Sequence, residues 1–369
     1  MAIMVCGGYD TGRRGVRSHA SRLTPDIYHL PPPRLQGSQL MPYCDSFNRP
    51  IEYLRISVTD RCNLRCVYCM PEEGVPLLAH EDILQYEEIA RLARIIVGLG
   101  VSKLRVTGGE PLARKGVEQL VAMLAEIPGV DDLAMTTNGI LLAGMAEQLA
   151  RAGLKRVNVS LDTLRPERFR AITRRGRLED VLAGMEAARR VGLTPIKINV
   201  VVIRGLNDDE VLDFARRTVE EGWHVRFIEF MPVGGERLWS EDGFVPTGEV
   251  RLRIEAAYGR LEAIDGQQGA GPARYYRVPG AAGTIGFISA LSEHFCFRCN
   301  RLRLTADGQL MPCLMSEQAV DLRAALRTGA SDEGLRELVL QAIGAKPPGH
   351  RMAQEPRGPG AKPMSRIGG

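Results

Sequence analysis

From residue 53 to residue 230 the chain alternates between two hydrophobic patterns. Short runs rich in Val, Ile, Thr and aromatic residues predict strands, and longer segments with apolar residues every three or four positions predict amphipathic helices. The predicted strands cover Tyr53–Thr59, Lys103–Thr107, Leu133–Thr137, Arg156–Leu161, Pro195–Ile203 and His224–Phe230. The predicted helices between them cover Glu87–Leu99, Val117–Ile127, Met145–Ala152, Leu178–Val191 and Asp209–Glu221.

This alternation predicts an α/β fold built from repeated βα units. Such units form a parallel sheet with right-handed crossovers, either as a barrel or as a doubly wound sheet. No Gly-x-Gly-x-x-Gly follows the first strand, which favours a partial (βα)6 barrel. After Met231, Gly-rich loops, short strands and two terminal helices predict a smaller C-terminal lobe.

We therefore divide the chain into four parts. Residues 1–46 contain Pro31-Pro32-Pro33 and no periodic apolar pattern, which predicts a disordered N-terminal extension. Its arginines also fit an organelle transit peptide, although no clear amphipathic helix supports this. The barrel is predicted over 47–232, the C-terminal domain over 233–345, and a flexible tail ending in Gly-Gly over 346–369.

Composition and charge exclude several classes of protein. The net charge is +4, and the residues from Gly344 onward alone carry five cations and one anion. The rest of the chain is close to neutral, which argues against a nucleic-acid-binding surface. The longest stretch without a formal charge, Val278–Ser292, has 15 residues and contains proline and glycine. A membrane-spanning helix needs about 18 or more apolar residues, so no membrane association is expected.

The eight cysteines are sparse, and six of them lie in two groups of three. This pattern is typical of metal or cluster ligation in a reducing compartment, so we expect a cytoplasmic protein. Cys6 and Cys44 have no spaced partner and are expected to be free thiols.

The first group, Cys62, Cys66 and Cys69, has the spacing C-x3-C-x2-C directly after the first strand. Loops after barrel strands lie at the carboxyl face, where active sites gather. A [4Fe–4S] cluster needs four ligands, so three cysteines would leave one iron open to another molecule. The alternatives are a zinc site, whose usual signature is paired C-x2-C elements, or a group of buried thiols.

This spacing, with Tyr68 before the last cysteine, resembles the radical S-adenosylmethionine (SAM) superfamily. The resemblance implies a partial or full βα barrel. Gly108-Gly109-Glu110-Pro111 ends the second strand, where the superfamily places a segment against the amino group of SAM. Ser160 and Met231 end the fourth and sixth strands at the same face of the barrel.

The second group, Cys296, Cys299 and Cys313, has the spacing C-x2-C-x13-C. It suits a second cluster with an open iron, or a zinc site completed by a residue such as His294. Arg301 and Arg303 alternate on a strand, which puts both guanidiniums on one face. Guanidinium groups suit phosphate oxygens and purine edges, and Arg55 and Arg105 are expected to converge with them at the barrel mouth.

Together these features resemble the GTP 3′,8-cyclase family, radical SAM enzymes that begin molybdenum cofactor synthesis. The resemblance covers residues 48–369. It rests on Thr59-Asp60-Arg61-Cys62-Asn63, Thr107-Gly108-Gly109-Glu110-Pro111, Thr136-Thr137-Asn138-Gly139, Val159-Ser160-Leu161-Asp162, Asn199-Val200-Val201, the Cys296–Cys313 segment and Ile367-Gly368-Gly369.

The resemblance implies a role for each matched residue. Cys62, Cys66 and Cys69 would hold the SAM-binding [4Fe–4S] cluster, and Cys296, Cys299 and Cys313 the second one. Contacts to SAM would come from Tyr68, Gly109, Ser160 and Met231. GTP would be bound by Arg55, Arg105, Thr136, Lys197, Arg301, Leu302 and Arg303. Arg301 and Arg303 would also assist catalysis, and the Gly-Gly end would reach into the active site.

The implied reaction converts GTP into 3′,8-cyclo-7,8-dihydro-GTP after a 5′-deoxyadenosyl radical removes the hydrogen at C3′. The implied partners are a homodimer mate, an electron donor such as flavodoxin or ferredoxin, and the downstream cyclic pyranopterin monophosphate synthase. One alternative is another radical SAM enzyme with an auxiliary cluster, such as a peptide-modifying maturase, although those usually carry more C-terminal cysteines. The other is a zinc-binding interaction protein, which leaves the barrel pattern and Gly108-Gly109-Glu110-Pro111 unexplained.

Overall fold

The computed structural model describes residues 35–36, 39–40, 42–233, 239–264, 271–316, 318–350 and 364–368. Its strands are β1 Leu35–Gln36, β2 Gln39–Leu40, β3 Tyr53–Ser57, β4 Lys103–Thr107, β5 Asp132–Thr137, β6 Arg156–Ser160, β7 Lys197–Val202, β8 His224–Glu229, β9 Glu262–Ala263, β10 Arg274–Arg277, β11 Thr284–Ile288, β12 Arg301–Leu304, β13 Gln309–Met311 and β14 Val320–Asp321. Its α-helices are α1 Tyr86–Val97, α2 Val117–Ala125, α3 Ala146–Arg151, α4 Pro166–Thr173, α5 Leu178–Arg190, α6 Val211–Glu220, α7 Thr247–Tyr258, α8 Leu322–Arg327, α9 Asp332–Gly344 and α10 Met364–Ile367.

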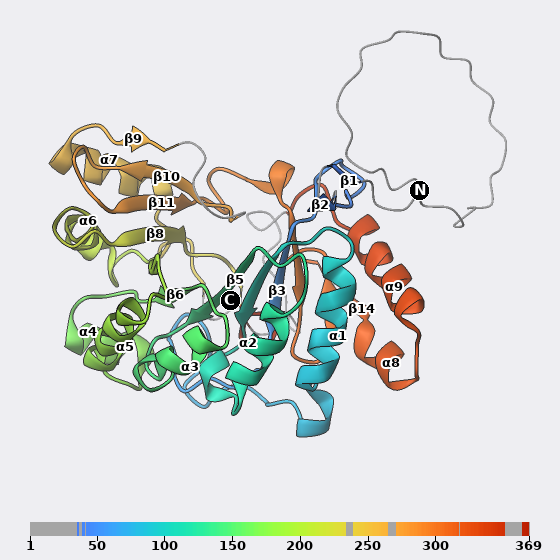
Figure 1. The fold of residues 1–369 in the computed structure, drawn as a ribbon. Coiled ribbons are helices and arrows are strands. Elements are labelled where there is room, and N and C mark those ends of the chain that lie inside the picture. The colour runs from blue at the N-terminus through green and yellow to red at the C-terminus, as the bar shows by residue number, and fades with distance from the viewer. Residues whose placement is uncertain are drawn as a thin grey trace, which may run out of the picture.

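All six predicted barrel strands are present, and they neighbour one another in chain order from β3 to β8 (Figure 1). Each of these pairs is parallel, as the βα pattern predicts. The predicted helices are confirmed as α1, α2, α3, α5 and α6. The short helix α4 was not predicted, and β7 begins at Lys197 because Pro195 has no N–H for the ladder.

The C-terminal region continues this sheet rather than building one of its own in the described residues. β11 adds parallel to β8 at one edge, and β12 adds parallel to β3 at the other. The described sheet has the order β14-β13-β12-β3-β4-β5-β6-β7-β8-β11-β10-β9. The loop from β11 to β12 therefore connects the two edges of the barrel sheet, and it contains Cys296 and Cys299.

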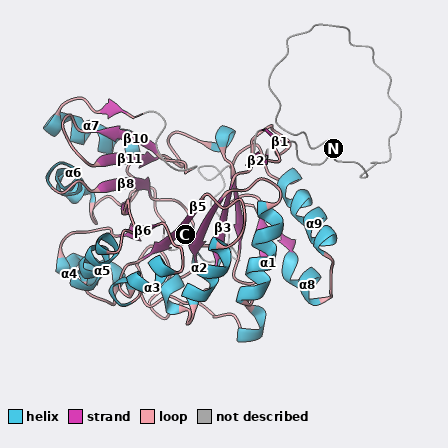
Figure 2. Ribbon diagram, in the orientation of Figure 1, coloured by secondary structure: helices cyan, strands magenta, loops and turns pink. Residues whose placement is uncertain are grey.

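The helices cover the outer face of the sheet, with the strands inside (Figure 2). In α1, Ile89, Leu92 and Ile96 are fully buried, as the helical period of apolar residues requires. Leu54 and Ile56 of β3 belong to the same apolar core. Because strand side chains alternate between faces, Arg55 between them points into the barrel. No described helix is long and apolar enough to cross a membrane.

The predicted N-terminal extension lies mostly outside the described residues. Within it, Tyr43 and Cys44 are buried, and the Tyr43 N–H donates to the Leu99 carbonyl at 3.1 Å. The packed part of the chain therefore includes these residues. Cys44 is disulfide-bonded, so the expectation that it is a free thiol is wrong. Spacing along the chain cannot reveal such a pair, because a disulfide depends on proximity in space.

Candidate active site

The first cysteine group lies on the loop that follows β3, at the carboxyl end of the barrel. Cys62, Cys66 and Cys69 all line one cavity inside the barrel. The loop is fixed to the end of α4, because the N–H groups of Arg65 and Val67 donate to backbone carbonyls there at 3.0 and 2.9 Å. Three thiols thus face one cavity from a single anchored loop.

Burial makes these thiols hard to ionise unless a cation lies beside them. Burial, followed by the influence of Cys69 and Asp162, raises the pKa of Cys66 well above its usual range. Burial likewise raises the pKa of Cys69 to about 12. Adjacent buried thiols ionise readily only when a cation compensates their charge, which is what cluster iron does.

A single-ion site is not formed by this group. Within the described part of the chain, no three His, Cys, Asp or Glu side chains converge closely enough to hold one metal ion. A [4Fe–4S] cluster is larger than an ion, so its ligands lie further apart. Three cysteine thiols that face one cavity are the donor set that a [4Fe–4S] cluster with one open iron requires.

Tyr68 links the cysteine loop to the barrel wall. Its hydroxyl donates to the Asp162 carboxylate at 2.5 Å, and that carboxylate also accepts from the Val201 N–H at 2.8 Å. Burial raises the pKa of Asp162 to about 6. Tyr68 and Asp162 both line the cavity, so the position of the loop depends on the ends of β6 and β7.

The segment after β4 packs directly on the cysteine loop. A Cβ on Gly109 would lie 2.3 Å from the carbonyl oxygen of Arg61, so only glycine fits there. The Gly109 N–H donates to the Thr59 carbonyl at 2.6 Å, and the Glu110 N–H donates to the Arg61 carbonyl at 2.8 Å. The glycine was expected to admit a ligand; the close neighbour that the structure shows is the cysteine loop itself.

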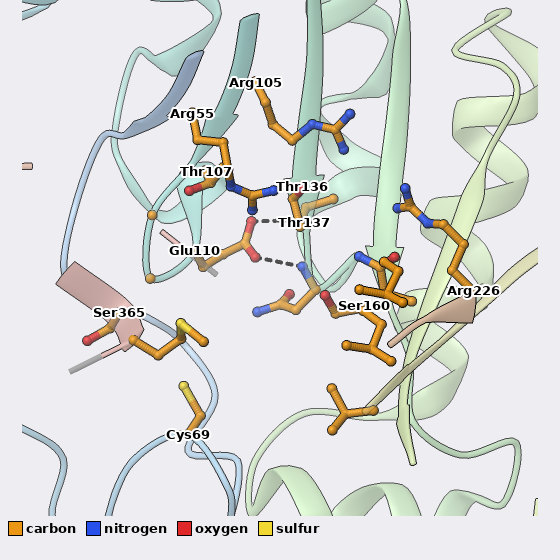
Figure 3. Close-up of a pocket in the computed structure, with 18 of the residues that line it drawn as sticks. Arg55, Cys69, Arg105, Thr107, Glu110, Thr136, Thr137, Ser160, Arg226 and Ser365 are labelled. Atoms are coloured by element: carbon orange, nitrogen blue, oxygen red, sulfur yellow. Dashed lines mark hydrogen bonds between the residues drawn. The ribbon is translucent and has the colours of Figure 1, made fainter. Parts of the chain in front are cut away.

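Glu110 organises the same region from within. Its buried carboxylate accepts from the Thr137 hydroxyl and the Asn138 N–H, both at 2.7 Å, and from the Leu112 N–H at 3.0 Å (Figure 3). Burial raises its pKa to about 7 although these bonds oppose the rise. With all its oxygens engaged, Glu110 is suited to positioning the loops.

Cationic side chains converge in the cavity from β12 and from five of the six barrel strands, β3, β4, β6, β7 and β8. Figure 3 shows Arg55, Arg105 and Arg226 projecting into it. The full set that lines the cavity is Arg55, Arg105, Arg156, Lys197, Arg226, Arg301 and Arg303. The strand register aligns Arg303 with Arg55 and Arg55 with Arg105.

Burial makes this cluster of positive charge costly. It lowers the pKa of Arg303 to about 10, with Arg301 adding to the effect, and that of Arg105 to about 10 as well. The Nε atoms of Arg105 and Arg226 are buried and have no hydrogen-bond partner among the described residues. Buried cations with unused donors fit a multiply charged anion such as a triphosphate.

The second cysteine group lies beside this cavity. Arg301, Arg303 and Leu314, which flank its cysteines in sequence, line the cavity, whereas Cys296, Cys299 and Cys313 do not. Burial opposes ionisation of Cys299, but the charges of Arg301 and Lys346 lower its pKa to about 6. The surroundings of Cys299 therefore favour a thiolate, the form that ligates iron, whereas burial raises the pKa of Cys296.

The C-terminal end returns to the same cavity. Met364 and Ser365 of α10 line it, as does Cys69 of the first cysteine group. The Arg303 guanidinium donates to the Gly368 carbonyl at 2.6 Å. Gly368 has a φ of +74°, and a Cβ there would lie 2.2 Å from the Thr107 hydroxyl, so this position requires glycine. Gly369 lies outside the described residues.

The sequence of the chain matches two family models and several known proteins. Residues 56–218 match the model of the Radical SAM superfamily, and residues 223–352 match that of Molybdenum Cofactor Synthesis C. The GTP 3′,8-cyclases of Heliobacterium modesticaldum and Pelotomaculum thermopropionicum are each 53% identical over 325 residues, covering 88% of this chain and 99% of theirs. That of Thermodesulfovibrio yellowstonii is 51% identical over 326 residues. The chain belongs to the GTP 3′,8-cyclase family.

Solved structures support the fold. The crystal structure of Streptococcus suis SuiB bound to the precursor peptide SuiA has a TM-score of 0.56 and 14% identity. The match covers 79% of this chain and 68% of SuiB. SuiB bound to S-adenosylmethionine also gives a TM-score of 0.56. At this identity the likeness concerns the fold alone.

The cavity of this GTP 3′,8-cyclase family member brings together most of the predicted site residues. Its lining includes Tyr68, Gly109, Ser160 and Met231, predicted for SAM, and Arg55, Arg105, Thr136, Lys197, Arg301 and Arg303, predicted for GTP. Among the residues predicted for SAM and GTP, Leu302 is the exception. Its side chain is fully buried in the apolar core, because strand alternation turns it away from its arginine neighbours.

Several residues that line the cavity were not predicted, among them Arg156, Arg226 and Tyr275. Arg156 and Arg226 lie inside strands β6 and β8, and Tyr275 of β10 accepts a hydrogen bond from the Lys197 ammonium at 3.4 Å. The two arginines could have been predicted from the sequence, because a charged side chain within a buried parallel strand needs a partner inside the barrel. Tyr275 could not, since the pairing of β10 with β11 could not be foreseen.

Proposed function

We propose that this protein converts GTP into (8S)-3′,8-cyclo-7,8-dihydroguanosine 5′-triphosphate, the first step of molybdenum cofactor biosynthesis. Membership of the GTP 3′,8-cyclase family supports this proposal. The structural observation that carries it is the cavity in which three cysteines and a cluster of buried cations face the same space. When bound, a [4Fe–4S] cluster and SAM supply a 5′-deoxyadenosyl radical that takes the C3′ hydrogen of GTP.

The chain's own residues hold and shield these groups. Cys62, Cys66 and Cys69 hold the SAM-binding cluster, and Tyr68, Gly109, Ser160 and Met231 contact SAM beside it. Cys296, Cys299 and Cys313 hold a second cluster at the edge of the cavity. These assignments are supported by the placement of the residues and by the thiolate-favouring surroundings of Cys299.

The buried cations anchor the triphosphate. Arg55, Arg105, Arg156, Lys197, Arg226 and Arg303 supply guanidinium and ammonium donors inside the barrel, where low polarity strengthens charge interactions. A radical reaction demands that the reacting carbon and the radical stay close together, so fixing the substrate is the main task of the protein. Arg301 and Arg303 lie between the cavity and the second cysteine group and act on the ribose and base.

Family membership also supports the remaining partners. We infer that the protein acts in the cytoplasm as a homodimer and receives electrons from a flavodoxin or ferredoxin. Its product passes to cyclic pyranopterin monophosphate synthase. These inferences rest on the family alone.

An anaerobic assay tests the proposed reaction. The protein is reconstituted with iron and sulfide, reduced with dithionite and supplied with SAM, and 5′-deoxyadenosine is quantified with GTP, with ATP or without nucleotide. We expect formation that rises specifically with GTP, together with a product that has the same mass as GTP but separates from it chromatographically, because one hydrogen atom leaves C3′ and one electron and one proton are added. Formation independent of GTP would contradict the substrate and favour a peptide-modifying enzyme. A protein that binds zinc and no iron would contradict the radical chemistry altogether.

A further inference from the structure

A buried lysine lies against the second cysteine group. Lys346 follows α9, is only 3% exposed, and donates through Nζ to the carbonyls of Arg301 at 2.8 Å and Pro312 at 2.6 Å. Pro312 directly precedes Cys313, and Arg301 follows Cys299 by two residues. The ammonium thus lies between the start of β12, which follows Cys299, and the end of β13, which precedes Cys313.

The charge of Lys346 has no carboxylate partner among the described residues. Its two carbonyl acceptors satisfy hydrogen bonds but do not neutralise a full positive charge. Burial lowers the pKa of Lys346, Cys299 and Cys313 lie close enough to oppose that shift, and Arg301 and Arg49 add to it. A buried ammonium is costly unless an anion lies nearby, so the site is built for negative charge at the cysteines.

Arg49 fixes the segment that contains this lysine. Its buried guanidinium is paired with Asp45 at 2.6 Å and donates to the carbonyls of Pro347 at 2.6 Å and Pro348 at 3.0 Å. The same group donates to the Cys296 carbonyl at 2.7 Å. One side chain therefore ties the residues after Lys346 to the cysteine loop.

We propose that Lys346 is the buried counter-cation of an anionic cluster held by Cys296, Cys299 and Cys313, and that it raises the reduction potential of that cluster. The proposal rests on the second cluster of the proposed function. Adding an electron makes the cluster more negative, and a nearby cation stabilises that state more than the oxidised one. Lys346 is a positioning and tuning residue, because it lines no part of the substrate cavity.

Removing the charge while keeping a donor tests this role. Lys346→Gln and Lys346→Arg are made in a full-length parent carrying Cys62→Ser, Cys66→Ser and Cys69→Ser, so that one cluster remains. Lys155→Gln, which removes the same charge at an exposed position, is the matched control. After reconstitution, iron is counted and the midpoint potential is measured by electron paramagnetic resonance during redox titration.

We expect Lys346→Gln to lower the ratio of reduced to oxidised cluster at fixed potential at least tenfold, which is about 59 mV for a one-electron couple. Lys346→Arg and Lys155→Gln should stay near the parent. An unchanged or higher midpoint in Lys346→Gln would overturn the proposal while leaving the second cluster intact. A parent that binds no cluster would instead overturn the second cluster of the proposed function, and this proposal with it.

The apo-proteins supply a second readout in case the glutamine variant does not retain its cluster. If Lys346→Gln unfolds at the same temperature as the parent without iron, and only Lys346→Arg retains the cluster, the counter-cation role is supported. If both variants lose the cluster, or the apo-form of Lys346→Gln unfolds at a clearly lower temperature, the lysine is structural and the proposal is wrong.

Discussion

Gly109→Ala tests whether the packing of two loops fixes the site of the first cluster. An added Cβ would lie 2.3 Å from the carbonyl oxygen of Arg61, 2.6 Å from its carbonyl carbon and 2.9 Å from the carbonyl oxygen of Asp60. These are backbone atoms, so no side chain can rotate away. Ordinary contact begins at 3.4 Å, so the two segments must separate by about 1.1 Å.

That separation gives the size of the expected effect. It would break the hydrogen bonds from Gly109 to Thr59 and from Glu110 to Arg61, each worth about 1 kcal/mol. Forcing an extra carbon into a packed region costs about 1–3 kcal/mol more. We expect the free energy of unfolding to fall by about 3–5 kcal/mol. Since Cys62 follows Arg61, a shift of about 1 Å at the cluster loop should slow SAM cleavage by a factor on the order of 100.

The assay combines urea unfolding of the apo-protein, iron counted after reconstitution, and 5′-deoxyadenosine formed with dithionite and SAM. Gly248→Ala is the control, because a Cβ at Gly248 in α7 meets no atom within 4 Å. That variant should be stabilised slightly, by about 0.4–1 kcal/mol, and should cleave SAM normally. If Gly109→Ala matched Gly248→Ala in stability, iron content and SAM cleavage, the reasoning from loop packing would be refuted.

Three further predictions follow from the site. Cys66→Ala should abolish 5′-deoxyadenosine with or without GTP, whereas Cys313→Ala should keep some SAM cleavage and lose cyclisation; cyclic product from Cys313→Ala would contradict the second cluster. Arg226→Met should weaken GTP binding at least tenfold, because a charged hydrogen bond contributes about 1.5–3 kcal/mol, and equilibrium binding should show no change for the exposed Arg204→Met. Glu110 has a pKa raised from 4.5 to about 7, so the folded apo-protein binds more protons than the unfolded chain in that range and loses stability as pH rises through it. Urea unfolding at pH 4 and pH 8 should show a loss that is about 3 kcal/mol larger in the wild type than in Glu110→Gln, in which the buried Asp162 still titrates, and an equal loss in both proteins would exclude Glu110 as a source.

The barrel was predictable because its signals are local. Strands such as Lys103–Thr107 and helices such as α1 show their period within a few residues, and the structure confirms both. The second cysteine group was recognised from the spacing of its cysteines, but its position beside the cavity was not predicted. That position depends on the pairing of β11 with β8 and of β12 with β3, and such pairings between distant segments leave no local pattern in the sequence.

The same distinction separates the site residues that were found from those that were missed. Arg55 and Arg105 were predicted because they are charged residues inside strands. Arg226 on β8 has the same feature and could have been predicted in the same way. Lys346 has no such feature. Its acceptors belong to residues 45 and 34 positions earlier in the chain, and its sequence neighbours suggest only the end of a helix.

The missed lysine shows that the C-terminal segment contributes both to the second cysteine group and to the cavity. Lys346 acts where the strands around Cys299 and Cys313 meet, and Gly368 accepts from Arg303 inside the cavity. Both belong to the segment that composition alone marks as a tail, because a few residues that bury little apolar surface give no periodic pattern. Their contacts are made with the backbone or with charged groups instead. A terminal segment that requires glycine at Gly368 and buries the charge of Lys346 is therefore constrained by chemistry at the site, and substitutions there should affect clusters and substrate before they affect folding.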